Sequence, residues 1–356
     1  MISFTVSRRL HDDSTAWCSD RSAGPVHVPA AAPSGPLGPR GVRVAWSILL
    51  ALVVLGALPA LARADLLYGT YHSFDVPGAT STSISSINDL GQVVGTFNTF
   101  SNFFTDRSGG LVLNAIPGFN SQPFAINASG QILFNTGSSG GPTILDPNTG
   151  MQFGPFNPPD SNSFSSVGRG FNNRGDIAGN YVSTTDGKSH IFIYHQGTGT
   201  FTTFDLPGFT SRTTVNGLND NGVIVGTEGG HGFRFDGTTL TLIDYPGART
   251  TALVGINDNG LMVGTYTLGF TINNSFVTDG VTFTPIVYPG TVNGTIVTGI
   301  NDEGEIVGRY FFPGDAAHTH GFLADPVPEP SSLLLAGTAG VVGLGHRVWR
   351  RRRPRG

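Results

Sequence analysis

The sequence predicts an all-β fold: a single six-bladed β-propeller with four short strands in each blade. Three elements recur between residues 65 and 326, namely a hairpin with Asn and Gly at its turn, a short aromatic strand, and a strand that runs into Pro-Gly. One set of elements spans about 43 residues, a period typical of a propeller blade. A β-helix is the rival architecture, but its coils are typically shorter and lack a four-strand cycle. No segment of this region shows sustained helical periodicity with caps.

The hairpin is the most regular of the three elements. Asn at the first position of a type I turn caps the backbone, and Gly three residues later accepts the left-handed conformation that closes the hairpin. Apolar residues on both sides predict two short buried strands. The six pairs are Asn88/Gly91, Asn127/Gly130, Asn172/Gly175, Asn219/Gly222, Asn257/Gly260 and Asn301/Gly304.

The other two elements lie between the hairpins. The aromatic strands end in Asp and begin near Asn102, Pro142, His190, His231, Ser275 and His320. The Pro-Gly strands begin at Ser73, Leu113, Gly154, Thr203, Leu242 and Pro285. The aromatic copy at Pro142 and the Pro-Gly copy at Gly154 are degenerate, so the second and third units depart most from the repeat.

The ends of the repeat region are out of phase, which predicts how the ring closes. The region opens with a lone Pro-Gly strand, Tyr71–Gly78, and ends with a lone aromatic strand, His320–Asp325. Joined, the two strands complete a sixth blade and leave no exposed sheet edge. We therefore expect Tyr71–Gly78 to be the outermost strand of that blade.

The residues that precede the repeats predict export. Residues 44–61 are apolar, follow two arginines, and end at an A-x-A site made by Ala62 and Ala64. This layout is typical of a secretory signal peptide, here residues 42–64, cut by signal peptidase after Ala64.

Residues 1–41 fit poorly in front of a signal peptide. They are rich in Pro, Ala, Gly and Ser, and we interpret them as a non-native or disordered extension, with translation starting near Val42 or Val44. The single cysteine, Cys18, lies in this extension, so the mature chain has no disulfide and no cysteine-based metal site.

The mature repeat region is strongly acidic. Residues 65–326 contain 17 Asp and 3 Glu against 7 Arg and one Lys, a formal charge of −12, whereas the whole chain carries −4. A domain with this charge repels nucleic acid and anionic lipid, so we exclude nucleic acid as a partner.

The C-terminal residues 327–356 combine a short motif, an apolar run over residues 331–345 and a basic tail. The motif consists of Val327, Pro328, Glu329 and Pro330. The basic stop consists of Arg347, Arg350, Arg351, Arg352 and Arg353. Fifteen apolar and small residues are marginal for a span that normally takes about 20 residues, and the arginines favour the cytoplasmic side. The tail predicts a short transmembrane helix as a transient anchor; an ordinary tail anchor is the alternative.

The order of motif, apolar run and arginine cluster resembles the PEP-CTERM sorting signal. The resemblance implies an exosortase-type transpeptidase as a processing partner, and the cell surface or extracellular matrix of a Gram-negative bacterium as the destination. The repeats resemble the HAF-type extracellular repeat, with its Gly-Ile-Asn-Asp-x-Gly-x-Ile-Val-Gly and His-Gly-Phe patterns, most closely in residues 217–233, 255–266 and 299–322. This second resemblance implies an exported repeat protein and carries over no catalytic residues.

Most acidic residues sit at repeated positions, and a residue repeated once per blade is first a folding device. Four lie in the hairpin turns, at Asp89, Asp220, Asp258 and Asp302, and three precede Pro-Gly, at Asp75, Asp205 and Asp244. We predict no catalytic residue and no cofactor. Asp315, His318 and His320 are spaced like metal ligands, so a loop zinc site is one alternative. Because structural zinc usually needs four ligands, we favour the interpretation that they are polar residues at a strand edge. The Asn-Asp-x-Gly turns lack the ligand pattern of calcium loops.

Two functions remain open. In the first, the chain is a non-catalytic surface or biofilm-matrix protein, structural or carbohydrate-interacting, with exopolysaccharide or a matrix protein as partner. In the second, it is an exported hydrolase or lyase that acts on exopolysaccharide. Carboxylates that converge at one end of the channel would favour the enzyme. The scarcity of Glu favours the first function. Any ligand site is expected in the insertions Pro155–Val167 and Ser183–Ser189, because loops on a rigid scaffold tend to carry function.

Overall fold

The computed structural model describes residues 68–98, 101–106, 109–114, 116, 122–135, 140–161, 166–206, 213–269, 274–291, 294–313 and 318–327. These residues belong to the second of two compact units, residues 65–356. The predicted extension, signal peptide and sorting helix lie outside the described residues, as do Ala62, Ala64, residues 328–330 of the motif and the basic stop. In the described ranges, no helix is long and apolar enough to cross a membrane.

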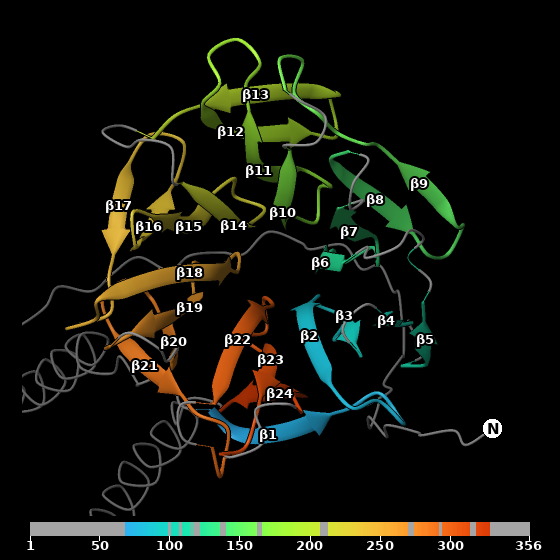
Figure 1. Cartoon of the computed structure of the whole chain (residues 1–356), viewed down its shortest axis with the longest axis vertical. Helices are drawn as coiled ribbons and strands as arrows, with labels where there is room; N and C mark the ends of the chain where they lie inside the picture. Colours follow the sequence, from blue (N-terminus) through green and yellow to red (C-terminus); the bar gives the residue numbers. More distant parts are fainter. Residues whose placement is uncertain are drawn as a thin grey trace, which may run out of the picture. The chain divides into compact units, whose positions relative to one another are not determined.

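The described strands form six four-stranded sheets, numbered here as blades 1 to 6 (Figure 1). Blade 1 contains β2 (Thr82–Ile87), β3 (Val93–Phe97), β4 (Ser101–Thr105) and β5 (Leu111–Leu113). Blade 2 contains β6 (Gln122–Ile126), β7 (Ile132–Asn135), β8 (Pro142–Asp146) and β9 (Met151–Phe153). Blade 3 contains β10 (Val167–Phe171), β11 (Ile177–Val182), β12 (Ser189–His195) and β13 (Thr200–Phe204).

Blades 4 to 6 repeat the pattern. Blade 4 contains β14 (Thr214–Leu218), β15 (Ile224–Glu228), β16 (His231–Phe235) and β17 (Leu240–Ile243). Blade 5 contains β18 (Thr250–Ile256), β19 (Met262–Thr267), β20 (Asn274–Thr278) and β21 (Phe283–Ile286). Blade 6 contains β22 (Thr295–Ile300), β23 (Ile306–Tyr310), β24 (His320–Pro326) and β1 (Tyr68–Phe74).

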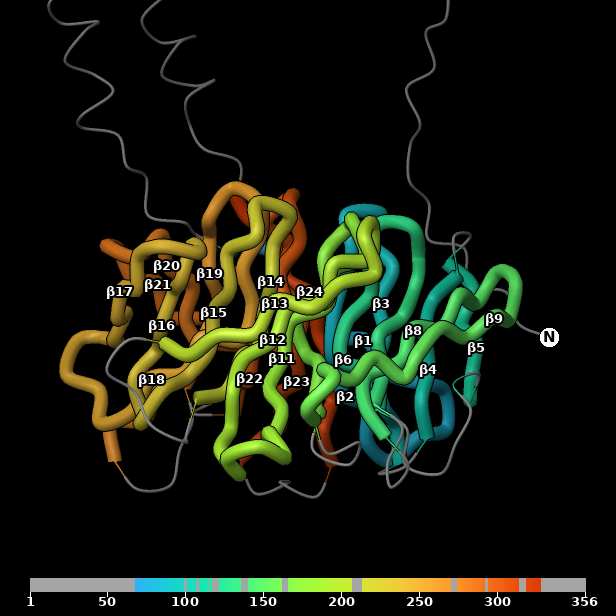
Figure 2. Tube along the Cα trace, turned by 90° about the horizontal axis from the view of Figure 1, so that it is seen from above, coloured from blue at the N-terminus to red at the C-terminus, as the bar shows by residue number. Residues whose placement is uncertain are grey.

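Each blade is an antiparallel meander whose first strand lies at the centre of the ring. The inner strands β2, β6, β10, β14, β18 and β22 surround a central channel, and the Pro-Gly strands lie at the rim (Figure 1). Turned by 90°, the ring is seen from its edge, and its strands lie in one disc-like layer (Figure 2). The prediction of an all-β, six-bladed propeller with four strands per blade is confirmed.

The ring closes within blade 6, as predicted. Strand β1 pairs with β24, with Tyr71 opposite Ala324 and Phe74 opposite Gly321. The strand covers Tyr68–Phe74 rather than Tyr71–Gly78, because Gly78 belongs to a turn and has a positive φ of 79°. The Tyr68 hydroxyl also donates a hydrogen bond of 2.8 Å to the Gly304 carbonyl, so the first described residue is fastened to the last hairpin.

The core consists of clusters between neighbouring blades. One cluster joins Val263 of blade 5 to Ile306 and Phe322 of blade 6, all fully buried. The aromatic residue of the third strand lies over a glycine of the second strand: a Cβ on Gly308 would approach the Phe322 ring to 2.7 Å. The cross-strand pairs that share this arrangement are Gly95/Phe103, Gly179/Phe192, Gly226/Phe233, Gly264/Phe276 and Gly308/Phe322.

Blade 2 reverses this cross-strand pair. There Phe134 takes the place of the glycine and faces Thr143, which takes the place of the aromatic residue. Both are buried, Phe134 completely. Moving the large side chain to the partner strand conserves the packed volume, and volume-conserving exchanges are the ones that cores tolerate best. The copy that looked degenerate in sequence therefore forms a regular blade.

Candidate functional site: the central channel

Every inner strand bulges toward the channel at the same repeat position. The ladder between the first two strands skips one residue in each blade, three positions before the hairpin Asn. A bulge leaves its extra residue unpaired and redirects its side chain. The six bulged residues are Ser85, Phe124, Arg169, Asn216, Val254 and Thr298, and all of them line one cavity of about 390 Å³.

The residue after each bulge is small because the inner strands approach one another closely. A Cβ on Gly217 would lie 3.2 Å from the Gly255 Cα, and a Cβ on Gly299 would lie 3.2 Å from the Ser86 Cα. Blades 1 and 2 carry Ser86 and Ala125 at this position, and the other four blades carry glycine. Close backbone contact between blades thus narrows the channel just beyond the bulged residues, five of which line both the cavity and the hairpin end.

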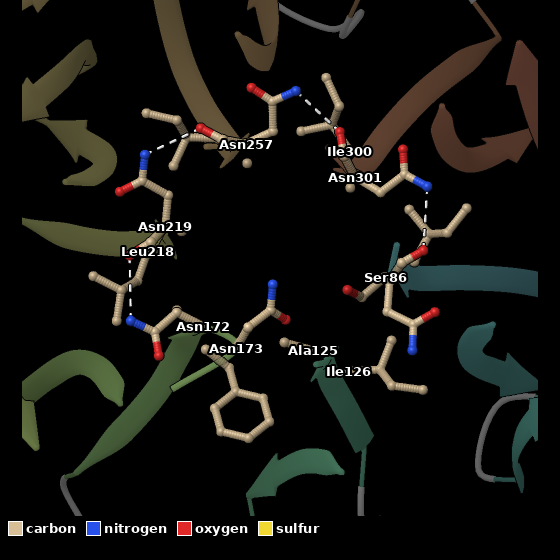
Figure 3. Close-up of a pocket in the computed structure, with 18 of the residues that line it drawn as sticks. Ser86, Ala125, Ile126, Asn172, Asn173, Leu218, Asn219, Asn257, Ile300 and Asn301 are labelled. Atoms are coloured by element: carbon tan, nitrogen blue, oxygen red, sulfur yellow. Dashed lines mark hydrogen bonds between the residues drawn. The ribbon is translucent and has the colours of Figure 1, made fainter. Parts of the chain in front are cut away.

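At the hairpin end, the repeated asparagines connect the blades. Each Oδ1 accepts the N–H of its own turn, as Asn257 does from Leu261 at 2.9 Å. In five blades the Nδ2 donates to the asparagine carbonyl of the next blade. The bonds that Asn219 and Asn257 donate can be followed in Figure 3. These bonds run from Asn88 to Asn127 (2.8 Å), Asn172 to Asn219 (3.3 Å), Asn219 to Asn257 (3.0 Å), Asn257 to Asn301 (3.0 Å) and Asn301 to Asn88 (3.1 Å). The sequence predicted only the capping role.

Asn127 is the exception among the six. Its Nδ2 donates to Gln131 Oε1 at 3.0 Å within its own hairpin, while its Oδ1 accepts the Gln131 N–H at 2.9 Å. The capping role is therefore common to the repeat, and the link to the next blade is a separate function of the same side chain.

The aspartates of the hairpin turns form a second set of contacts beside the asparagines. An Oδ1 atom accepts the backbone N–H of the corresponding residue in the preceding blade. These bonds run from Asn173 to Asp220, Asp220 to Asp258 and Asp258 to Asp302 (2.7 Å each) and from Asp302 to Asp89 (2.9 Å). Asn173 plays the same role for Ala128 at 2.7 Å. Because Ala128 has no side-chain oxygen, Asn173 Nδ2 reaches across blade 2 to Asp89 Oδ2 at 3.0 Å.

The structure thus gathers Asp89, Asp220, Asp258 and Asp302 at one end of the channel. Burial, with the neighbouring carboxylates adding to it, raises the pKa of Asp258 and of Asp302, although the bound N–H groups oppose the shift. The turns lie next to the ring axis, so the approximate rotational symmetry of the blades places their side chains close together. Sequence reasoning treated these residues as folding devices and missed the convergence. Among the described residues, no group of three or more His, Cys, Asp or Glu is arranged to hold a metal ion.

The opposite end of the channel is basic. Arg169, on the inner strand of blade 3, and Arg309, on β23 of blade 6, both line the 390 Å³ cavity. Burial lowers the pKa of both guanidinium groups. The Arg169 guanidinium lies 5.2 Å from the centre of the Phe124 ring, a cation–π geometry. Neither arginine was singled out from the sequence.

Three histidines at the start of the third strand pair with the aspartates that precede Pro-Gly. The Nδ1–carboxylate distances are 2.8 Å for His190–Asp205, 2.8 Å for His231–Asp244 and 3.0 Å for His320–Asp75. Each pair joins the third strand of a blade to the end of its fourth strand. For the proposed zinc cluster, Asp315 lies outside the described residues, and His320 contacts Asp75 instead.

The two insertions flagged in the sequence meet at blade 3. Ser183 Oγ donates to Asp160 Oδ2 at 2.9 Å, and the Thr184 N–H donates to the Asp160 carbonyl at 2.7 Å. The Phe156 ring packs on Tyr194 with centroids 4.4 Å apart. The insertions therefore form one joined surface, of which residues 162–165 lie outside the description.

The sequence comparisons address the C-terminus. A family model for the PEP-CTERM protein-sorting motif matches residues 326–353. The chain carries a PEP-CTERM sorting motif. This motif implies an exported, membrane-associated surface protein handled by an exosortase-type processing system. No curated protein matches the sequence.

Solved propellers resemble the fold at low identity. The propeller domain of the Trilobed protease from Pyrococcus furiosus has 13% identity and a TM-score of 0.43, with 69% of this chain and 85% of that chain covered. The RRP9 WD40 repeats have 9% identity and a TM-score of 0.43, with 74% and 100% covered. An oligogalacturonate lyase from Vibrio parahaemolyticus has 10% identity and a TM-score of 0.41, with 72% and 81% covered. Such identities transfer no activity to this chain.

Proposed function

We propose that this PEP-CTERM protein is a non-catalytic propeller of the cell surface or biofilm matrix of a Gram-negative bacterium, built from HAF-type repeats, that binds carbohydrate or another matrix component. The observation that carries the proposal is the sorting motif at residues 326–353, which accounts for export and for the destination. After export, an exosortase-type enzyme removes the tail that follows Pro-Glu-Pro.

The contacts of the channel aspartates support a non-catalytic role. A general acid or base exchanges a proton with its substrate through a carboxylate oxygen within hydrogen-bond reach. Here one carboxylate oxygen of Asp220, Asp258 or Asp302 accepts an N–H of the preceding blade at 2.7 Å, so these side chains already serve a contact between blades. Glu305 is likewise engaged, since it accepts the Asn301 Nδ2 hydrogen bond at 2.7 Å.

The charge of the mature region narrows the class of partner. A formal charge of −12 over residues 65–326 repels a strongly anionic polymer unless cations bridge the two. A neutral glycan, a cation-bridged glycan or a protein is therefore the expected partner. The joined insertions around Asp160 and Ser183, with Phe156 and Tyr194 beneath them, offer a surface that combines aromatic and polar groups.

One experiment tests binding against catalysis. The exported protein is purified from the producing cells and incubated with the exopolysaccharide of the same cells, and both retention of the polymer and its chain length are followed. Retention without shortening supports the proposal. Steady depolymerisation that is abolished by a single Asp substitution overturns it.

The second candidate, an exopolysaccharide hydrolase or lyase, is favoured by the convergence of four aspartates and by the raised pKa of Asp258 and Asp302. A carboxyl group whose pKa is raised toward neutrality is suited to general acid catalysis. Asp302→Asn keeps an oxygen that can accept the Asp258 N–H, so it removes the acid and preserves the fold. Depolymerisation that this variant loses while its melting temperature stays unchanged would establish the enzyme.

The sorting step has a separate readout. We expect mass spectrometry of the mature surface protein to recover no peptide from residues 331–345, because the tail is removed with the motif. Recovery of those peptides in the mature species would show that the tail is retained as a permanent anchor.

A further inference from the structure

Arg169, exposed to the channel, and Arg309, partly buried, line the channel cavity, and neither has an acidic partner among the described residues. Elsewhere on the ring, Arg174 contacts Asp176 at 3.2 Å and Arg234 contacts Asp236 at 3.4 Å. In the part of the chain that the structure describes, no carboxylate lies within ion-pair distance of Arg169 or Arg309. Because no carboxylate neutralises either guanidinium group, an anion that enters this cavity gains from both of them.

Neither arginine is required by the repeat. At the position of Arg309, the other blades carry only neutral polar residues: Thr96, Asn135, Asn180, Thr227 and Thr265. At the position of Arg169, the other blades carry Ser85, Phe124, Asn216, Val254 and Thr298. Because five blades form the same strands with neutral residues, the fold does not explain a positive charge at either place.

The two departures from the repeat meet in space. They belong to blades 3 and 6, which stand opposite each other across the ring (Figure 1). Both side chains nevertheless line the same cavity, which therefore receives a guanidinium group from two opposed blades. Its volume of about 390 Å³ is that of a site for a small molecule.

The remaining lining residues indicate what the rest of the ligand carries. Ser85 and Thr298 supply hydroxyl groups, Asn216 supplies an amide, and Phe124 supplies an aromatic ring that also holds the Arg169 guanidinium. Such a wall combines one apolar surface with several hydrogen-bonding groups, which suits a compact ring that bears hydroxyl groups. The aspartates at the hairpin end repel an anion, so the ligand enters from the arginine end.

We propose that the channel cavity binds a sugar acid, the carboxylate of which lies between Arg169 and Arg309. A guanidinium group is planar and donates two parallel N–H bonds, so it matches a carboxylate in geometry as well as in charge. This proposal deepens the binding role proposed above and rests on it. A single carboxylated sugar unit inside the channel is also compatible with an acidic exterior, because both arginines line the cavity that it enters.

The test is calorimetric titration of the mature protein, purified after export, with D-glucuronate, D-galacturonate, glucose, acetate and inorganic phosphate. We expect a uronate to bind, glucose to bind at least tenfold more weakly, and uronate affinity to fall as salt is raised. Arg309→Thr introduces the residue that blades 1, 4 and 5 carry, and Arg169→Asn the residue of blade 4. Each substitution is expected to weaken uronate binding by tenfold or more, since hydrogen bonds to charged groups are strong.

Arg234→Gln is the matched control, because Arg234 pairs with Asp236 outside the channel and its loss leaves uronate affinity unchanged. Thermal melts verify that each variant is folded. If Arg169→Asn does not fold, Arg309→Thr alone is enough to test the site. Uronate binding that survives Arg309→Thr overturns the site. Acetate or phosphate that binds as tightly as the uronates overturns the sugar assignment, as does the absence of any uronate binding.

The polymer assay separates this inference from the proposed function. If uronate binding depends on the arginines while the protein depolymerises exopolysaccharide, the inference stands and the non-catalytic role fails. If the protein retains intact polymer but binds no uronate, the inference alone fails.

Discussion

The two ends of the channel are built from the same six inner strands, yet they follow the repeat to different degrees. At the hairpin end, Asn occurs in all six blades and Asp in four, and their side chains bond one blade to the next. At the cavity end, the six bulged residues are all different. The difference teaches that uniform positions maintain the ring, whereas positions free to vary are available for a ligand.

Among the changes that test how the ring is maintained, opening it should have the largest effect on stability. Deleting residues 65–78 removes β1, leaves β24 with an unpaired edge, and removes the bond from Tyr68 to Gly304. We expect cooperative unfolding to be lost, because the closed ring couples the six blades. Differential scanning calorimetry measures this. A truncated protein that melts as sharply and at the same temperature as the parent would show that closure through β1 is not needed.

The second prediction separates the two functions of the asparagines. Asn257→Ala removes a turn cap and the bond to the Asn301 carbonyl, whereas Asn127→Ala removes a cap without a bond to the next blade. We expect a loss of about 2–3 kcal/mol in the free energy of unfolding for Asn257→Ala and about 1 kcal/mol less for Asn127→Ala. Urea denaturation of both variants gives the difference. Asn127→Ala also removes the bond from Nδ2 to Gln131 Oε1, so equal losses would mean that the bond to the next blade contributes no more than this bond within the hairpin.

The third prediction concerns Asp258. Asp258→Ala should cost about 1 kcal/mol, because the Asp220 N–H loses its acceptor, whereas Asp258→Asn retains an acceptor and lacks the charge. The pKa of Asp258 is raised in the fold, first by burial and then by neighbouring carboxylates. The native state therefore binds more protons than the unfolded state between the two pKa values, and wild-type stability falls as pH rises through that window.

Asp258→Asn lacks this loss, so its stability relative to wild type should rise from pH 3 to pH 7. Denaturation at both pH values measures it. A pH-independent difference between the Asn variant and wild type would contradict the raised pKa.

The smallest effect on stability is expected at the cavity end, where a substitution should leave the free energy of unfolding unchanged or raise it rather than lower it. Arg309→Thr removes a partly buried charge that has no acidic partner and restores the residue of three other blades. We expect the free energy of unfolding to stay level or to rise by up to about 1 kcal/mol. The same chemical denaturation experiment reads it out. A loss of more than about 1 kcal/mol would assign the arginine to the fold and would erase the contrast between the two ends.

Sequence periodicity predicted the local elements well. Gly91 and its five equivalents have φ values of 70° to 82°, as the turn chemistry required, and the turns show the expected Asn carbonyl to Gly N–H bond. The phase of the first and last elements predicted the closure of blade 6. These features follow from short-range interactions that the local sequence of each repeat determines by itself.

The sequence did not predict the contacts between blades or the residues that converge at the ring axis, because both depend on how the blades are placed relative to one another. Nothing within one repeat says that the Asn257 amide reaches the next blade, or that turns 38, 44 and 213 residues apart place their aspartates together. Arg169 and Arg309 are far apart in sequence and occupy different repeat positions. Reading each position down the six copies would have identified Arg309 as the one charged residue among Thr and Asn. The same comparison shows Phe134 and Thr143 as an exchanged pair.

The order of strands in blade 6 has a mechanical consequence. The sorting motif match begins at Pro326, the last residue of β24, so a pull on an attached C-terminus loads β24 first. This strand lies between β1 and β23 and is paired along both edges. A force along its axis must shear both ladders at once, whereas a strand at the rim would peel away one hydrogen bond at a time. Because the N-terminal strand covers its outer edge, the propeller resists a pull applied at Pro326, where the sorting motif match begins.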